Sequence, residues 1–192
     1  MQFVYIKDDA LSKKECERII KVFESNPLKH KEGITLSGTE HQSKKSTDWC
    51  KSFAHEDCID LLLEEKLVEH TKNYHDFVKG INFVSSSWSL DPYYNIQRYE
   101  PKEGYFAWHH EHGMWDRFPK NPAIRRILAW MIYLNDVPDG GTEFMDQEQT
   151  IEAKSGRIVI WPAYWTHTHR GQISNTTIKY IATGWYNFDI PQ

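Results

Sequence analysis

The histidines of this 192-residue chain gather in two short runs. Five of the ten lie in WHHEHG, which contains His109, and in WTHTHRG, which contains His167 and His169. A neutral imidazole is the commonest metal ligand among side chains. Two such runs about sixty residues apart in the sequence form a metal site if the fold brings them together.

Alternation along an extended strand places His109 and Glu111 on one face and His110 on the other. A histidine and a carboxylate on one face can coordinate the same metal ion. With a second histidine, this is the donor set of Fe(II) sites that keep open coordination positions. His167 and His169 are both candidates for that histidine, because they also alternate onto one face.

Other interpretations of these residues remain open. A lone histidine on a strand is more often a hydrogen-bonded core or surface residue than a ligand. Two histidines and a glutamate also make a catalytic zinc set. The helical zinc signature H-E-x-x-H is absent, since Met114 stands where its second histidine would be.

A lysine interrupts the apolar run IKYIATGW at Lys179. Burial of a cation is costly unless an anion meets it. Lys179 therefore either reaches solvent or holds a carboxylate ligand.

Helical patterns dominate the first part of the chain. In LSKKECERIIKVFESN the apolar residues recur at helical spacing, and Ser12 with Glu15 matches a capping box. A second helix is predicted from about Asp57 to Val78. Residues 28–52 contain few aliphatic side chains and predict loops or short irregular strands.

Short β-rich runs follow Gly80. They are NFVSSSWSL, YNIQRY, GYFAWHHEH, RRILAWMIYLND, TEFMD, QTIEA, GRIVIWP, YWTHTHRG and IKYIATGWYNF, with turn signals at PDGG and KSGR. Eight or nine strands at this spacing indicate a sandwich or barrel. We expect an α+β fold, a double-stranded β-helix (jelly roll) whose N-terminal helices buttress one sheet. Residues 1–192 form a single domain in this prediction, with helical support over about 1–80 and the jelly-roll core over about 81–190.

Composition excludes several classes of protein. The formal net charge is −4, and no basic stripe favours nucleic acid as a partner. The longest apolar run, residues 127–134, is too short to span a membrane, and the N-terminal residues do not match a signal peptide, so we expect a cytoplasmic protein. Cys16, Cys50 and Cys58 form no C-x-x-C pair and are expected to be reduced thiols.

Three segments together resemble a known family. They are YNIQRYEPKEGYFAWHHEHG, RRILAWMIYLNDVPDGGTEF, and THRG with the lysine of IKYIATGW ten residues after its histidine. This combination, from Tyr94 to Tyr186, resembles the 2-oxoglutarate and Fe(II)-dependent dioxygenases, specifically the prolyl 4-hydroxylase-like branch. The chain departs from that branch in two places, with Glu111 where most members have aspartate and Phe106 where tyrosine is usual.

The resemblance implies a role for each of eight residues. The ten-residue step to the lysine selects His169 over His167. The implied iron ligands and catalytic residues are His109, Glu111 and His169; the implied 2-oxoglutarate-binding residues are Lys179, Tyr133 and Tyr99; the implied substrate-binding residues are Trp185 and Trp108.

The implied activity is hydroxylation of a prolyl residue in a peptide or protein. It would consume 2-oxoglutarate and O2, release succinate and CO2, and use ascorbate as a supporting reductant. The loops around Lys44 to Trp49, within a polar segment from His41, would hold the peptide. Two alternatives remain: a hydroxylase of a free amino acid or other small molecule, and a non-catalytic metal-binding jelly-roll module. Glu111 in place of aspartate leaves the substrate class open.

Overall fold

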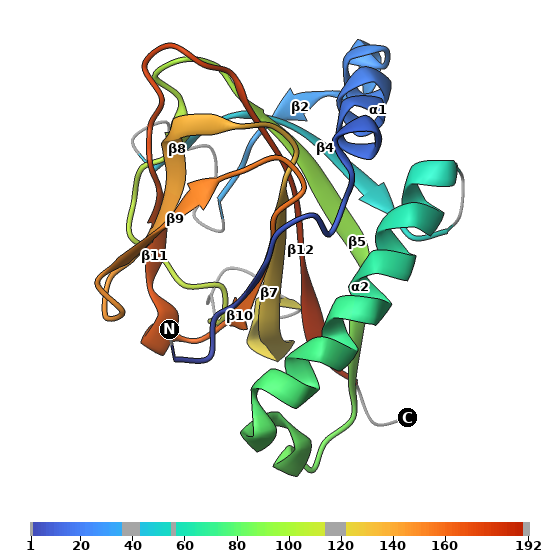
Figure 1. Cartoon of the computed structure of the whole chain (residues 1–192), viewed down its shortest axis with the longest axis vertical. Helices are drawn as coiled ribbons and strands as arrows, with labels where there is room; N and C mark the ends of the chain where they lie inside the picture. The colour runs from blue at the N-terminus through green and yellow to red at the C-terminus, as the bar shows by residue number, and fades with distance from the viewer. Residues whose placement is uncertain (1, 36–42, 55–56, 114–121, 190–192) are drawn as a thin grey trace.

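The computed structural model of the protein describes residues 2–35, 43–54, 57–113 and 122–189. Within these ranges two β-sheets face each other, and two helices lie against the outer side of the larger sheet (Figure 1). The fold therefore contains two buried layers, one between the two sheets and one between the larger sheet and the helices. The fold class predicted from the sequence, an α+β jelly roll with N-terminal helices, is confirmed.

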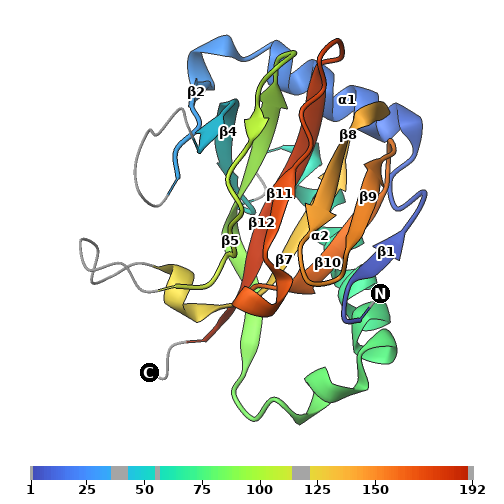
Figure 2. The same cartoon turned by 90° about the vertical axis from the view of Figure 1, so that its left-hand side faces the viewer.

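The larger sheet is antiparallel. In the described ranges its strand order is β1 (Tyr5–Lys7), β10 (Ile158–Pro162), β7 (Arg126–Tyr133), β12 (Lys179–Phe188), β5 (Trp88–Tyr99), β4 (Thr47–Ser52) and β2 (Lys31–Glu32). The smaller sheet, at the front of Figure 2, has the order β11 (His169–Gly171), β8 (Val137–Phe144) and β9 (Gln149–Ala153). A two-stranded ribbon pairs β3 (Lys44–Lys45) with β6 (Gly104–Tyr105).

The two long helices are α1 (Lys13–Glu24) and α2 (Cys58–Phe77). The predicted capping box at Ser12 is present, and Asp57 forms a second one with Asp60. Short 3-10 helices complete the connections: η1 (Pro27–Lys29), η2 (Lys79–Phe83), η3 (Pro122–Arg125) and η4 (Trp165–His167). No helix in the described ranges is long and apolar enough to cross a bilayer.

Two hydrophobic layers hold these elements together. One lies between the helices and the larger sheet and includes Phe23, Leu63 and Trp130. The other lies between the two sheets and includes Tyr133 and Phe144. Every residue of β7 is buried because both of its faces are covered, which explains why its sequence RILAWMIY lacks polar alternation.

The first eighty residues contribute strands as well as helices. β1 pairs with β10, and β4 extends the larger sheet beyond β5. In the predicted polar segment residues 44–45 thus lie in β3 and residues 47–49 in β4, whereas His41 and Gln42 lie outside the described residues. The predicted strands NFVSSSWSL and YNIQRY also differ from the structure, since residues 79–83 form η2 and residues 88–99 form one strand, β5.

Candidate active site

One short contact between backbones joins the two histidine runs. His109 forms an isolated β-bridge with His169, with both N–H···O distances at 2.9 Å. The Glu111 amide donates to the carbonyl of Ala163 at 2.9 Å. Of the predicted strand GYFAWHHEH, only Gly104–Tyr105 forms a regular strand. Individual backbone hydrogen bonds position His109 and Glu111.

These contacts bring together His109, Glu111 and His169. One ligand atom from each lies within 4.8 Å of the others. Oε1 of Glu111 is 3.6 Å from Nε2 of each histidine. Ligand atoms that are each about 2.0–2.2 Å from a metal lie about 3–4 Å apart, so the set fits one divalent ion.

Hydrogen bonds fix the histidine tautomers in the form that a metal needs. Nδ1 of His109 donates to the Ala107 carbonyl at 2.9 Å, and Nδ1 of His169 donates to the His167 carbonyl at 2.9 Å. Since carbonyl oxygens only accept, each Nδ1 carries the proton and each Nε2 presents a lone pair.

The charge states agree with this arrangement. Burial lowers the pKa of His109, and the neighbouring His169 lowers it further. Burial by itself would raise the pKa of Glu111, but neighbouring groups, the Arg126 guanidinium among them, hold it well below its usual range. Neutral imidazoles and an ionised carboxylate are the forms that bind metal.

The far oxygen of Glu111 is occupied by two donors that the sequence did not link to it. Nε1 of Trp185 donates to Oε2 at 2.9 Å, and Nη1 of Arg126 donates to it at 3.2 Å. The Arg126 guanidinium lies over the Trp185 ring at 3.5 Å. Only Oε1 then faces the histidines. Arg126 is the first residue of the apolar strand β7, but nothing in the local sequence indicates its contact with Glu111.

His167 lies outside the ligand set. It belongs to η4 rather than to a strand, so the predicted shared face with His169 is wrong. Its Nε2 donates to the Gln2 carbonyl at 3.1 Å, and its Nδ1 hydrogen-bonds Thr166 Oγ1 at 3.0 Å. Both ring nitrogens are therefore engaged, Nε2 with the N-terminal segment and Nδ1 with the neighbouring threonine.

A cavity of about 440 Å³ contains the ligand set. Lys179, Lys44 and Asp48 also line it. Tyr105, which the sequence did not identify, stacks on the His109 ring with centroids 3.5 Å apart. The ligand set thus shares one cavity with two buried lysines, Lys44 and Lys179.

Lys179 is a buried ammonium that is 6% exposed. Nζ donates to the carbonyls of Gly140 at 3.0 Å and Gln172 at 3.1 Å. Among the described residues no carboxylate lies within ion-pair distance of it, and burial lowers its pKa to about 8. Such a group fits an anionic ligand that enters the cavity.

Gly140 makes room for this lysine. A Cβ at that position would collide with Val137 and come within 3.3 Å of the Lys179 stem. The predicted turn PDGG instead forms part of β8, with a shift in register between Val137 and Thr142.

The two predicted tyrosines occupy different positions. Tyr99 lines the cavity, with the Lys179 ammonium 5.1 Å from its ring centroid, and its hydroxyl donates to Gln97 at 2.7 Å. Tyr133 lies behind the cavity wall, where its hydroxyl hydrogen-bonds Thr142 Oγ1 at 2.7 Å. Thr142 lines the cavity in its place, as does Met131, which lies two residues before Tyr133 on the same face of β7.

The two predicted tryptophans also differ. Trp185 lines the cavity. Trp108 is 38% exposed and does not line it; the Arg170 guanidinium lies 4.4 Å from its ring. The structure therefore does not support Trp108 as part of the substrate pocket, because its side chain projects away from the cavity that His109 faces.

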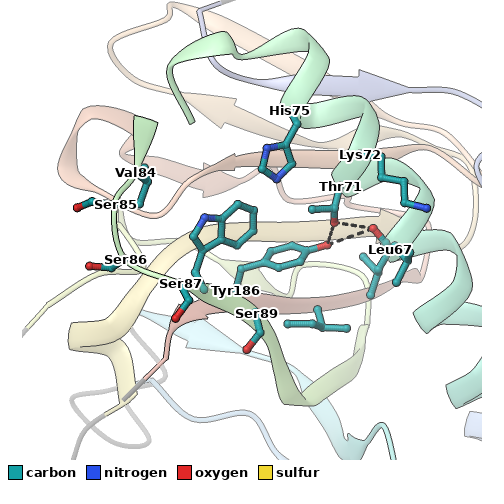
Figure 3. A pocket seen from close by; sticks show the side chains of 13 residues that line it. Leu67, Thr71, Lys72, His75, Val84, Ser85, Ser86, Ser87, Ser89 and Tyr186 are labelled. Atoms are coloured by element: carbon teal, nitrogen blue, oxygen red, sulfur yellow. Dashed lines mark hydrogen bonds between the residues drawn. The ribbon is translucent and has the colours of Figure 1, made fainter. Parts of the chain in front are cut away.

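A larger groove of about 660 Å³ lies elsewhere, between α2 and the start of β5 (Figure 3). Trp88 and Tyr186 line it, and the Tyr186 hydroxyl contacts Thr71. Tyr186 and Trp185 are neighbours on β12, so they face opposite sides of the larger sheet. His75 is the only described side chain of a metal-binding type on this groove, which makes the smaller cavity the candidate site.

Comparison with known proteins agrees with this geometry. Residues 94–187 match the model of the 2OG-Fe(II) oxygenase superfamily. This segment contains all three residues of the ligand set and Lys179. No curated protein sequence matches the chain.

Several solved structures with a similar fold are prolyl hydroxylases. The viral collagen prolyl hydroxylase of Paramecium Bursaria Chlorella virus-1, in a 2OG complex, has a TM-score of 0.70 at 18% identity and covers 98% of this chain and 97% of its own. A Pseudomonas putida prolyl-4-hydroxylase has a TM-score of 0.70 at 11% identity, with coverages of 96% and 92%. A Trichoplax adhaerens prolyl hydroxylase, in complex with a hypoxia inducible factor peptide fragment, has a TM-score of 0.75 at 13% identity, with coverages of 98% and 84%.

Residues 94–187 are thus identified as a 2OG-Fe(II) oxygenase domain. It is an Fe(II)- and 2-oxoglutarate-dependent dioxygenase with a prolyl 4-hydroxylase-like fold, and Fe(II), 2-oxoglutarate and O2 are the groups that this superfamily implies.

Proposed function

We propose that the enzyme hydroxylates a prolyl residue within a peptide or protein and converts 2-oxoglutarate to succinate and CO2. The observation that carries the proposal is a single cavity that contains both the ligand set and the buried ammonium of Lys179. The similarity in fold to prolyl hydroxylases, one of them solved with a peptide fragment, supports a peptide as the substrate.

His109, Glu111 and His169 would hold Fe(II). The metal, when bound, supplies the oxygen chemistry of the reaction. The protein contributes geometry: three ligands from one side leave the remaining coordination positions toward the cavity. Arg126 and Trp185 keep Glu111 in place, which compensates for the extra methylene of glutamate relative to aspartate.

2-Oxoglutarate fits between the ligand set and Lys179. The ammonium of Lys179 would meet the carboxylate far from the metal, and the hydroxyl of Thr142 is available beside it. We assign Tyr133 the supporting role of orienting that hydroxyl. Tyr99 would close the same pocket, and ascorbate would serve as the supporting reductant.

The direct test is the coupling of succinate formation to substrate. We expect proline-containing peptides to raise succinate formation above the rate without peptide and to gain the mass of one oxygen atom on proline. Free proline should be a much poorer substrate, because it lacks the flanking groups whose binding energy positions the reacting carbon. Mass spectrometry that places the oxygen on a free amino acid, another residue type or another small molecule would reject the prolyl assignment. Absence of 2-oxoglutarate turnover with iron bound would instead indicate a non-catalytic binding module.

A second prediction concerns the indole that holds Glu111. Trp185→Phe keeps an aromatic ring but removes the donor to Oε2. Loss of a group that orients a metal ligand typically weakens metal binding by about 10- to 100-fold. Anaerobic titration with Co(II), followed by its absorption, measures the change. Trp165→Phe, at an exposed tryptophan outside the cavity, is the matched control. Equal affinity in Trp185→Phe and the parent enzyme would show that the indole does not position Glu111.

A third prediction follows from the lowered pKa of Lys179, about 8. The protonated lysine binds a carboxylate, so affinity for 2-oxoglutarate should be constant below pH 8 and fall as the pH rises through that value. Well above it, the loss approaches about tenfold per pH unit. Lys179→Arg should flatten the profile, because arginine stays charged. Anaerobic fluorescence titrations measure the affinity for 2-oxoglutarate at pH values below and above 8. The same dependence of affinity on pH in the parent enzyme and in Lys179→Arg would contradict the prediction.

A further inference from the structure

A chain of hydrogen bonds runs along one wall of the cavity, from Tyr99 beside Lys179 to Lys44. Tyr99 donates to Oε1 of Gln97 at 2.7 Å, and Nε2 of Gln97 donates to Asp48 at 3.0 Å. Nζ of Lys44 donates to the same Asp48 oxygen at 2.7 Å, and Ser46 donates to the other oxygen at 2.8 Å. The direction of the chain fixes the orientation of the Gln97 amide, with its NH2 group toward Asp48.

Most of the side-chain groups on this wall that can still form hydrogen bonds are donors. Both oxygens of Asp48 already accept hydrogen bonds. Lys44, with three protons, donates only to Asp48 within the described ranges, and Gln97 has one further amide proton. Asn95 lines the same cavity, and among the described residues its side-chain amide makes no hydrogen bond. A ligand with unpaired acceptors matches this wall better than one with unpaired donors.

The wall lies close to the ligand set. Lys44 in β3 pairs with Tyr105 in β6, and its ammonium is 6.0 Å from the Tyr105 ring centroid. Tyr105 in turn stacks on His109. The Lys44 side chain is nearly fully buried, so its ammonium faces the cavity and the protein rather than bulk water. The Tyr105 ring therefore lies between a group bound to the Lys44 ammonium and the metal ligand His109.

We propose that Lys44, Gln97 and Asn95 form a specificity wall that binds the backbone carbonyls of an extended prolyl peptide. Proline has no backbone N–H, so a proline-rich segment presents carbonyl acceptors with few donors. A wall of donors complements that segment and disfavours the ammonium of a free amino acid. This inference depends on the proposed function and adds the groups that select the peptide.

The primary test compares two adjacent lysines. Lys44→Met removes the ammonium from the cavity, whereas Lys45→Met removes one that is 54% exposed and pairs with Glu103. Peptide dissociation constants and KM values are measured on the iron-loaded full chain with a proline-repeat peptide. We expect Lys44→Met to raise both by roughly 10- to 100-fold, the worth of one charged hydrogen bond, with a much smaller change in the KM for 2-oxoglutarate. Lys45→Met should behave like the parent enzyme. Equal peptide affinity in the two variants would overturn the proposal.

A second pair of variants is needed if the Lys44→Met protein misfolds because the Asp48 carboxylate has lost its cation. Lys44→Arg keeps a charged donor and should restore most of the affinity. Asn95→Ala breaks no hydrogen bond among the described residues and should still weaken peptide binding by about 3- to 10-fold. No change in Asn95→Ala, together with a folded Lys44→Met of parental affinity, contradicts the wall.

Modified peptides identify the acceptor. Each carbonyl of the peptide is replaced in turn by a thiocarbonyl, which is a weaker acceptor. We expect one position at which the replacement weakens binding to the parent enzyme but not to Lys44→Met. If every position has the same effect in both proteins, Lys44 does not bind a carbonyl. If the parent enzyme hydroxylates no peptide at all, the proposed function fails, and that result is separate from the comparison of variants.

Discussion

Replacement of His169 by alanine should abolish tight iron binding, whereas replacement of His167 by glutamine should leave it intact. His169 supplies one of three converging ligand atoms, and its loss should cost more than the roughly 100-fold that a change in a supporting group costs. His167 has both ring nitrogens engaged elsewhere. His109→Ala and Glu111→Ala should behave like His169→Ala.

The measurement is bound iron after anaerobic loading and gel filtration. Circular dichroism of each variant shows whether it remains folded, which separates loss of a ligand from loss of structure. Iron lost from a folded His167→Gln and kept by His169→Ala would reverse the assignment of the distal ligand.

The second large effect is expected at the cosubstrate. Lys179→Met should raise the dissociation constant of 2-oxoglutarate by a factor between about 10 and somewhat more than 100, because one charged hydrogen bond is worth about 1.5–3 kcal/mol. Iron binding should change little, since Lys179 contacts Gly140 and Gln172 and not the ligand set.

Anaerobic titration of the iron-loaded variant with 2-oxoglutarate tests this expectation. Lys154→Met, at an exposed lysine on the surface, is the matched control. Parental affinity in Lys179→Met would remove this lysine from the cosubstrate pocket and leave the cavity without its assigned anion partner.

His109 and Glu111 were accessible from the sequence because their signal is local. The H-x-E spacing follows from the two-residue period of extended chain, which holds for His109 and Glu111 even though only one β-bridge anchors the segment. Capping boxes at Ser12 and Asp57 are likewise local, because the side chains that make them are three residues apart.

Roles that depend on contacts between strands were less accessible. Tyr133 shares a face of β7 with Met131, which lines the cavity, and no local pattern shows that Tyr133 instead hydrogen-bonds Thr142 and does not line it. The aromatic residue beside His109 is a similar case: Trp108 lies outside the cavity, and Tyr105 stacks on the ring instead.

The amino-acid sequence, through local periodicity, capping and spacing, was sufficient for the two helices, the class of fold and the candidate ligand pair His109 and Glu111, and the family resemblance selected His169 as the third candidate. It was not sufficient for the groups that hold Glu111 or for the wall around Lys44. Arg126 and Trp185 reach Glu111 across separations of 15 and 74 residues, and Gln97 reaches Asp48 across 49. Such contacts arise from strand order and register, which depend on packing of the whole core and have no local pattern to reveal them.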